Sequence, residues 1–294
     1  MTTTTVLTTA SAPFRIPANL HTTDEKTRPI LFLHGLFGSK KNNRGMRGAD
    51  VVDAKTRALA RDLGRSVYAL DLRNHGDSPH VPRHDYPAVA EDVAHFIQEH
   101  ELKDVSIIGH SMGAKTAMTL ALRSPELVSD LVAVDNAPID AAIGGGFAGY
   151  VRGMKEIDRA HVTRQADADK ILQKYEPSLP IRQFLLGNMH RVKARDSVHN
   201  QHVLQFRIPL DTLARALDGL GDFPFKDPQA VRFEKPALFV RGTHSKYVPD
   251  ETLPLIGQFF PRFEVVDIDA GHWLISENPE DFRQAVVRFL SPKE

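Results

Sequence analysis

Short runs rich in Val, Ile, Leu and Phe alternate with longer amphipathic stretches along most of the chain. Six such runs lack a regular polar alternation, and they lie at residues 30–33, 67–70, 105–108, 131–134, 237–240 and 265–268. Runs of this kind are typical of strands that are covered on both faces, as in a parallel sheet.

The stretches between these runs place apolar residues at helical spacing, and they lie at residues 53–63, 86–100, 112–122 and 279–290. Val89, Val93 and Phe96, for example, recur at intervals of four and three residues and predict one buried helix face. Strands that alternate with helices predict βαβ units. The expected fold class is therefore α/β, with a mostly parallel, doubly wound sheet.

The alternation stops between about residues 140 and 234, where helical patterns dominate and no convincing strand is found. We therefore expect a helical lid at residues 141–230, inserted into a core formed by residues 28–140 and 231–294. Residues 1–27 are predicted to be a flexible N-terminal segment, with a first short strand near residues 14–16.

Charge and composition narrow the classes of function. Of the 294 residues, 37 are Lys or Arg and 37 are Asp or Glu, so no bulk positive charge favours nucleic acid as a partner. The sequence contains no run of 18 apolar residues, so no membrane span is predicted. It contains no cysteine, which excludes disulfides and a thiol nucleophile. His199 and His202 are three residues apart, but no third residue stands at metal-ligand spacing. Neither a metal nor another cofactor is predicted.

A nucleophile elbow is predicted where the third apolar run meets the following helix. The sequence there is Gly109-His110-Ser111-Met112-Gly113, which is G-x-S-x-G between a strand and a helix, the context that this motif requires. The two glycines remove Cβ atoms that would collide in so sharp a turn. Ser111 is therefore the predicted nucleophile, held above the sheet edge at a helix N-terminus.

A serine hydroxyl needs a neighbouring base that takes its proton. In this type of fold the histidine follows the last strand. The sequence Ala270-Gly271-His272-Trp273 comes directly after the last strand-like run. Among the 14 histidines, His272 is therefore the predicted base.

The acid that orients the imidazole has two candidate positions. The common position is the loop after the penultimate strand, but Ser245 stands where an aspartate is expected, and the first acid there is Asp250. Asp135 ends the strand-like run directly before the insertion, at the functional edge of the sheet. We predict Asp135 as the acid and interpret Asp250 as the N-cap of a helix that begins near Glu251.

Acyl transfer also needs backbone N–H groups that bind the oxyanion. The candidates are the N–H groups of Met112 and of Leu36, with Phe37 as the less favoured alternative to Leu36. The predicted substrate pocket comprises His34, Gly35, Phe37, His110 and Trp273. The polar segment at residues 71–79 is interpreted as an Asx-type turn, and a His75 that faces the site is the alternative.

Four segments together resemble one branch of the α/β-hydrolases. They are HGLFGSKKNN (34–43), DLRNHGDSPH (71–80), GHSMGAKTAM (109–118) and VAVDNAP (132–138). The branch is the group of α/β-hydrolase domain-containing protein 11, with bacterial short-chain esterases and fungal ethanol acetyltransferases as relatives. The resemblance covers most of the chain from about Pro29 and is weakest in the lid. It implies the α/β-hydrolase fold and a triad that maps onto Ser111, Asp135 and His272.

The expected activity is that of a serine hydrolase that cleaves carboxylic esters or thioesters of short-to-medium acyl groups through an acyl-enzyme. The expected partner is a small-molecule substrate of this kind, with acyl-CoA among the candidates. One alternative is an alcohol O-acyltransferase that uses the same triad. The other is a non-catalytic partner protein on a hydrolase scaffold, and the complete set of catalytic groups argues against it.

Location is predicted from the N-terminal composition. Residues 1–27 are rich in threonine and contain no acid before Asp24, which is typical of a mitochondrial transit peptide. The resemblance also implies mitochondrial residence for the eukaryotic members of the group. A cytoplasmic location is the alternative.

Overall fold

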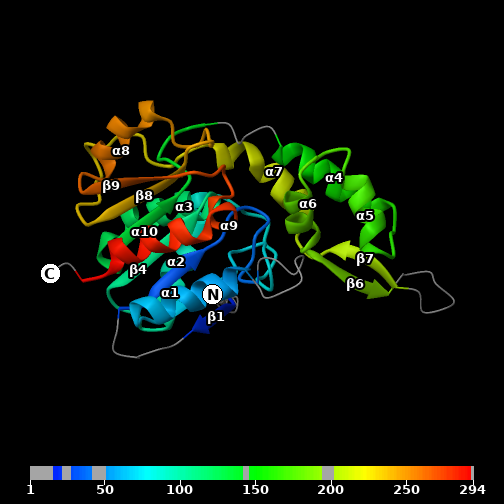
Figure 1. Cartoon of the computed structure of the whole chain (residues 1–294), viewed down its shortest axis with the longest axis horizontal. Helices are drawn as coiled ribbons and strands as arrows, with labels where there is room; N and C mark the ends of the chain where they lie inside the picture. Colours follow the sequence, from blue (N-terminus) through cyan, green and yellow to red (C-terminus); the bar gives the residue numbers. More distant parts are fainter. Residues whose placement is uncertain (1–15, 22–27, 42–50, 142–145, 194–201, 293–294) are drawn as a thin grey trace, which may run out of the picture.

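The computed structural model describes residues 16–21, 28–41, 51–141, 146–193 and 202–292. Its centre is a seven-stranded sheet in the order β1–β3–β2–β4–β5–β8–β9 (Figure 1). The strands are β1 (Ala18–His21), β2 (Ile30–Leu33), β3 (Val67–Leu70), β4 (Val105–His110), β5 (Val128–Val134), β8 (Ala237–Gly242) and β9 (Phe263–Ile268). β1 pairs antiparallel with β3, and the other neighbouring pairs are parallel. The mostly parallel sheet predicted from the sequence is confirmed.

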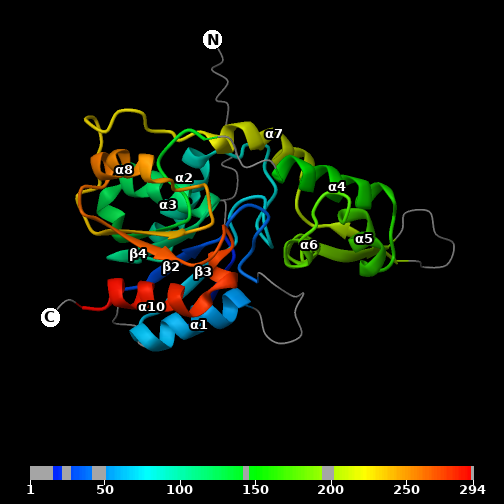
Figure 2. The same ribbon diagram turned by 45° about the horizontal axis from the view of Figure 1, so that its top comes forward.

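Helices cover both faces of this sheet (Figure 2). On one face lie α1 (Val51–Leu63), α9 (Leu274–Glu277) and α10 (Pro279–Leu290), and on the other lie α2 (Tyr86–Glu99), α3 (Met112–Arg123) and α8 (Leu253–Phe259). In β2, Leu31 packs with the second group of helices and Phe32 with the first. This double cover is why the strands are apolar runs in the sequence. In the described ranges, the helices are too short or too polar to cross a membrane.

The insertion folds into a lobe, here called the cap, which α7 joins to the sheet (Figure 1). Its elements are α4 (Phe147–Arg159), α5 (Gln165–Leu172), α6 (Leu179–Leu186), β6 (Met189–Lys193), β7 (His202–Phe206) and α7 (Leu210–Gly221). β6 and β7 form an antiparallel hairpin, so the expectation that the insertion holds no strand is wrong. These strands are only partly buried and mix polar with apolar residues. They therefore lack the apolar runs that reveal the strands of the core.

The cap ends earlier than predicted. The chain that follows Gly221 returns along the sheet domain, where the Phe223 ring lies 5.9 Å from that of Phe259 in α8. Phe233 then donates its N–H to the Phe259 carbonyl at 2.9 Å. The boundary therefore lies near Gly221 rather than at residue 230.

The sheet also begins inside the segment that was predicted to be flexible. β1 starts at Ala18 and pairs with β3 through the register Ala18 to Leu70. The strand expected at residues 14–16 is therefore displaced: Ile16 precedes β1, and residues 14 and 15 lie outside the described residues.

Candidate active site

Ser111 occupies a tight turn between β4 and α3. Its φ of +55° lies in the left-handed region, which residues other than glycine rarely adopt. A Cβ on Gly109 would lie 2.1 Å from the carbonyl oxygen of Gly113, and one on Gly113 would lie 2.3 Å from that of Leu33. The turn therefore requires both glycines, for the steric reason inferred from the sequence.

Ser111, His272 and Asp135 form one hydrogen-bonded chain. His272 Nε2 lies 2.9 Å from Ser111 Oγ, and His272 Nδ1 lies 2.6 Å from Asp135 Oδ2. The residues follow β4, β9 and β5, so three strand ends bring them to one edge of the sheet. Ser111 and Asp135 are buried, which limits competition from water. Such a chain can move a proton from the hydroxyl to the imidazole.

The carboxylate of Asp135 is fully buried, and its hydrogen-bond partners satisfy it. Oδ1 accepts from the Gly242 N–H at 3.2 Å, and Oδ2 accepts from Ser245 Oγ at 2.5 Å in addition to facing His272. Ser245 lies in the loop after β8, where the sequence lacks the expected aspartate. It acts there as a donor to the acid that follows β5.

Asp250 makes its contacts elsewhere. Its exposed carboxylate accepts from Arg241 Nη1 at 2.6 Å, and the same guanidinium contacts Asp267 on β9. The interpretation of Asp250 as an N-cap is wrong, because it lies inside the 3₁₀ turn Asp250–Thr252 and makes no capping bond. Its role in the structure is an ion pair at the surface.

The two candidate oxyanion donors, Leu36 and Met112, both line a small cavity beside Ser111. Met112 is the first residue of α3, so its N–H has no acceptor within the helix. Among the described residues, the N–H of Leu36 has no hydrogen-bond acceptor, whereas that of Phe37 donates to His75 Nε2 at 3.0 Å. Because the Phe37 N–H is occupied, Leu36 remains the candidate.

Two buried histidines hold the loops behind this turn. His34 Nε2 accepts from the Leu72 N–H at 3.1 Å, and His75 Nε2 accepts from the Phe37 N–H. Burial lowers the pKa of His34 to about 4 and the pKa of His75 to about 3. Both rings are therefore neutral at pH 7 and able to accept. His75 is part of the loop framework, which agrees with the structural interpretation of residues 71–79.

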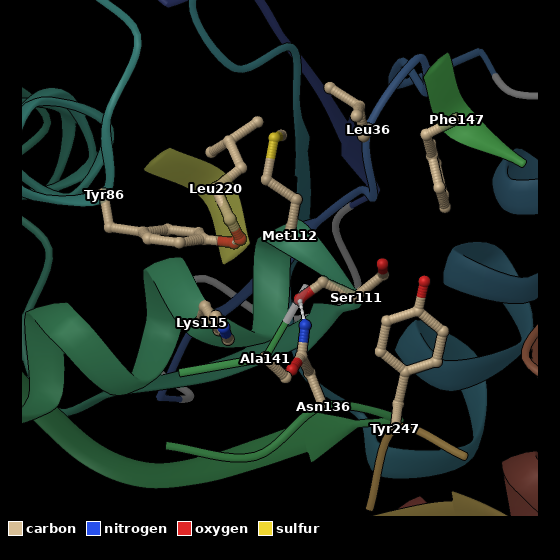
Figure 3. Close-up of a pocket in the computed structure, with 10 residues that line it drawn as sticks. All are labelled: Leu36, Tyr86, Ser111, Met112, Lys115, Asn136, Ala141, Phe147, Leu220 and Tyr247. Atoms are coloured by element: carbon tan, nitrogen blue, oxygen red, sulfur yellow. Dashed lines mark hydrogen bonds between the residues drawn. The ribbon is translucent and has the colours of Figure 1, made fainter. Parts of the chain in front are cut away.

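A small, mainly apolar cavity lies beside Ser111 (Figure 3). The space open to water is about 20 Å³, close to what one ordered water requires. The lining residues are Leu36, Tyr86, Ser111, Met112, Lys115, Asn136, Ala141, Phe147, Leu220 and Tyr247. Phe147 and Tyr247 lie on one side of Ser111, and Tyr86 and Leu220 lie on the other (Figure 3).

The residues predicted to form the substrate pocket do not line this cavity. They are His34, Gly35, Phe37, His110 and Trp273. His34 binds the neighbouring loop, and His110 Nε2 lies 2.8 Å from the carbonyl oxygen of His272. Trp273 packs on Phe184 of the cap, with ring centroids 4.7 Å apart. A place beside a catalytic residue or in the loop of the oxyanion donor does not fix the direction of a side chain.

The lining residues that the sequence did not reveal come from distant elements. Tyr86 begins α2, Phe147 begins α4 and Leu220 lies near the end of α7. Tyr247 lies in the loop after β8, and its ring stacks on His272 with centroids 4.1 Å apart. No local motif marks these positions, since only the packing of the cap on the sheet brings them together.

Lys115 fastens both ends of the cap to α3. Its ammonium donates to the carbonyl oxygens of Ile139 at 2.9 Å and Gly221 at 2.7 Å, where the chain enters and leaves the cap. Ala141 N–H donates to the same Gly221 oxygen at 2.9 Å, which joins the two connections. Burial lowers the pKa of Lys115 to about 8. One wall of the cavity is thus built from the two junctions of the cap.

The sheet order, the cap inserted after β5 and the elbow that carries Ser111 are those of an α/β-hydrolase. The model of the α/β-hydrolase fold family matches residues 28–279, and the chain belongs to this family.

Comparison with individual relatives narrows the group within this family and identifies the protein as an enzyme of the hydrolase type. A probable alcohol acetyltransferase of Saccharomyces cerevisiae is 43% identical over 277 residues, which cover 90% of this chain and 78% of that protein. The sn-1-specific diacylglycerol lipase ABHD11 of Mus musculus is 36% identical, with 95% and 86% covered. A solved marine microorganism esterase has a TM-score of 0.81 at 29% identity, with 95% of this chain and 100% of that one covered. The resemblance to the α/β-hydrolase domain-containing protein 11 group is confirmed.

Proposed function

We propose that this protein is a serine esterase that forms an acyl-enzyme on Ser111. The observation that carries the proposal is the hydrogen-bonded chain from Ser111 Oγ through His272 to Asp135. Relatives named as a lipase, an esterase and an acetyltransferase support it, because all three names describe transfer of an acyl group from an ester or to an alcohol.

The reaction proceeds in two acyl transfers. Ser111 Oγ attacks the acyl carbon as its proton passes to His272, and Asp135 stabilises the imidazolium. The N–H groups of Leu36 and Met112 bind the oxyanion of the tetrahedral intermediate. The intermediate collapses, the imidazolium protonates the leaving alcohol or thiol, and the acyl group stays on Ser111. Water, deprotonated by His272, then releases the carboxylic acid and restores the hydroxyl.

The cavity favours a short acyl group. Its free space is only about 20 Å³, so a long acyl chain requires a larger movement of the lining side chains than a short one. Leu36, Met112 and Leu220 supply apolar walls for the methyl end. Acetyl esters and acetyl thioesters, acetyl-CoA among them, present the same group to Ser111.

The test is a series of p-nitrophenyl esters with acyl chains of two to eight carbons. We expect the highest kcat/KM between acetate and butyrate, and a loss of about 1,000-fold or more in kcat for Ser111→Ala. Turnover that survives in this variant contradicts the proposal. A fluorophosphonate probe separates the esterase from a non-catalytic partner protein, since only a reactive Ser111 is labelled.

Alcohol acetylation is the second candidate, and the 43% identical relative favours it. An alcohol can replace water in the second transfer, because His272 deprotonates either acceptor. Incubation with acetyl-CoA and ethanol, followed by gas chromatography, measures ethyl acetate against free acetate. Ethyl acetate formed in excess of acetate assigns the acyltransferase activity, and acetate alone assigns the hydrolase.

A mitochondrial location is proposed from the threonine-rich, acid-poor composition of residues 1–23. Fusion of residues 1–27 to a fluorescent protein in yeast tests it. Mitochondrial fluorescence is expected, and a diffuse cytoplasmic signal contradicts the proposal.

A further inference from the structure

The peptide groups of Phe37 are bound from two directions. The four-residue turn 35–38 closes with a bond of 2.9 Å from the Gly38 N–H to the Gly35 carbonyl. Phe37 has a φ of +62° in this turn, a conformation that costs a large side chain about 1–2 kcal/mol. Such a residue stays there only when its surroundings hold it. The same turn contains Leu36, whose N–H is the candidate oxyanion donor.

One contact comes from the sheet domain and the other from the cap. The Phe37 N–H donates to His75 Nε2 at 3.0 Å, and the Phe37 carbonyl accepts from Asn188 Nδ2 at 2.8 Å. Both bonds are buried, so water does not readily replace either partner. The turn is therefore held jointly by the two lobes.

Asn188 is itself well fixed. It connects α6 to β6 and is 5% exposed. Its carbonyl accepts from the Arg207 N–H at 3.0 Å, which binds it to the segment after β7, and its N–H donates to the Leu185 carbonyl at 3.1 Å. The position of the side-chain amide that binds Phe37 therefore depends on the position of the cap.

We propose that Asn188 is a positioning residue through which the cap holds the oxyanion hole in place. This inference rests on the proposed esterase function. When the cap is seated, the Asn188 amide fixes the peptide after Phe37 while His75 fixes the peptide before it. The turn then keeps the Leu36 N–H directed toward the acyl oxygen. Loss of the Asn188 donor leaves the turn held on one side only, with a buried carbonyl unpaired.

The substitutions Asn188→Ala and Asn188→Asp test this assignment. Both remove the donor, and the second keeps the size of the side chain. We expect kcat to fall about tenfold or more in each, with KM changed less than about twofold, because the loss falls on the transition state. Arg207→Met is the matched control, because it keeps the backbone bond from the Arg207 N–H to Asn188 and changes only the side chain. It removes another polar contact between cap and core, Arg207 Nη1 to Asp77 Oδ1 at 3.2 Å, and should leave kcat nearly unchanged.

Inhibition distinguishes positioning from general damage to the fold. A short-chain trifluoromethyl ketone forms a tetrahedral adduct that needs the oxyanion hole, and its Ki should rise by the same factor as kcat falls. Circular dichroism and thermal unfolding identify any variant that does not fold, and the other Asn188 variant then decides.

Unchanged kcat in a folded Asn188 variant, a rise in KM alone, or an equal effect of Arg207→Met overturns the inference. The esterase proposal stands in those cases as long as Ser111→Ala remains inactive. Activity in Ser111→Ala instead contradicts the proposed function itself.

Discussion

Ser245 donates a hydrogen bond of 2.5 Å to Asp135 Oδ2, the same oxygen that lies 2.6 Å from His272 Nδ1. The acid comes from the end of β5, and the hydroxyl comes from the loop after β8. The loop that lacks an aspartate therefore still supports the acid, now as a donor. Because the carboxylate is buried, its geometry depends on both segments.

Ser245→Ala is expected to lower kcat/KM about tenfold or more. A hydrogen bond to a charged group contributes about 1.5–3 kcal/mol, and its loss leaves Asp135 less firmly oriented. Steady-state kinetics on p-nitrophenyl acetate measure the effect. Ser245→Thr keeps the hydroxyl and should retain most of the activity, so equal losses in the two variants contradict this role.

Asp135→Asn is expected to lower kcat by about 10⁴-fold, because the amide cannot stabilise the imidazolium and favours the wrong imidazole tautomer. Asp250→Asn is the matched control, since this acid pairs with Arg241 at the surface, and its kcat should stay within about twofold. A comparable loss in both variants speaks against the choice of Asp135.

Leu220→Ala is expected to move the preferred acyl chain to more than four carbons, because it removes an apolar wall of the cavity. Leu213→Ala is the control: Leu213 is also fully buried in α7 but does not line the cavity. The ester chain-length series measures the shift. If Leu213→Ala gives the same shift, the cause is loosening of α7 and not pocket size.

Gly109→Ala is expected to destabilise the fold by about 3 kcal/mol or more, because the new Cβ would lie 2.1 Å from a backbone oxygen. Gly219→Ala provides the contrast. Gly219 lies in α7 with nothing within 4 Å of an added Cβ, and the change should stabilise by about 0.5–1 kcal/mol. Urea unfolding measures both, and a neutral Gly109 variant shows that the elbow tolerates a side chain.

Stability should fall as the pH drops below about 6.5. Burial lowers the pKa values of His34, His75 and His84 to about 4, 3 and 3 from 6.5, so the unfolded chain binds protons that the folded chain does not. The free energy of unfolding is therefore highest above pH 6.5. It falls as the pH drops, and the contribution of each histidine stops changing below its folded pKa of about 4 or 3. Each histidine contributes a slope of up to about 1.4 kcal/mol per pH unit.

Urea unfolding at pH 7, 6 and 5 measures this slope. His84→Asn should reduce it, and His84 suits the test because its Nε2 is buried without a partner among the described residues. Stability that stays flat or increases toward pH 5 contradicts the assignment.

Local signals made much of the fold predictable. The strands β2, β3 and β8 could be predicted from their apolar runs. Helices cover both faces of the sheet, so these strands have no polar face. Ser111 could be predicted as the nucleophile because so tight a turn requires glycines at positions 109 and 113. The β6–β7 hairpin escaped prediction because its strands are only partly buried and carry mixed residues.

The sequence by itself determined the alternation of strands and helices in the core from β2 onward, the elbow and the three residues that meet at the sheet edge. Strand direction and residue order settle these features, because parallel strands all end at one edge. Only the tertiary structure decided which side chains surround Ser111. Tyr86, Phe147, Leu220 and Tyr247 are brought there by the packing of the cap on the sheet. Such packing depends on contacts between distant segments, and no local pattern in the chain encodes where those segments meet.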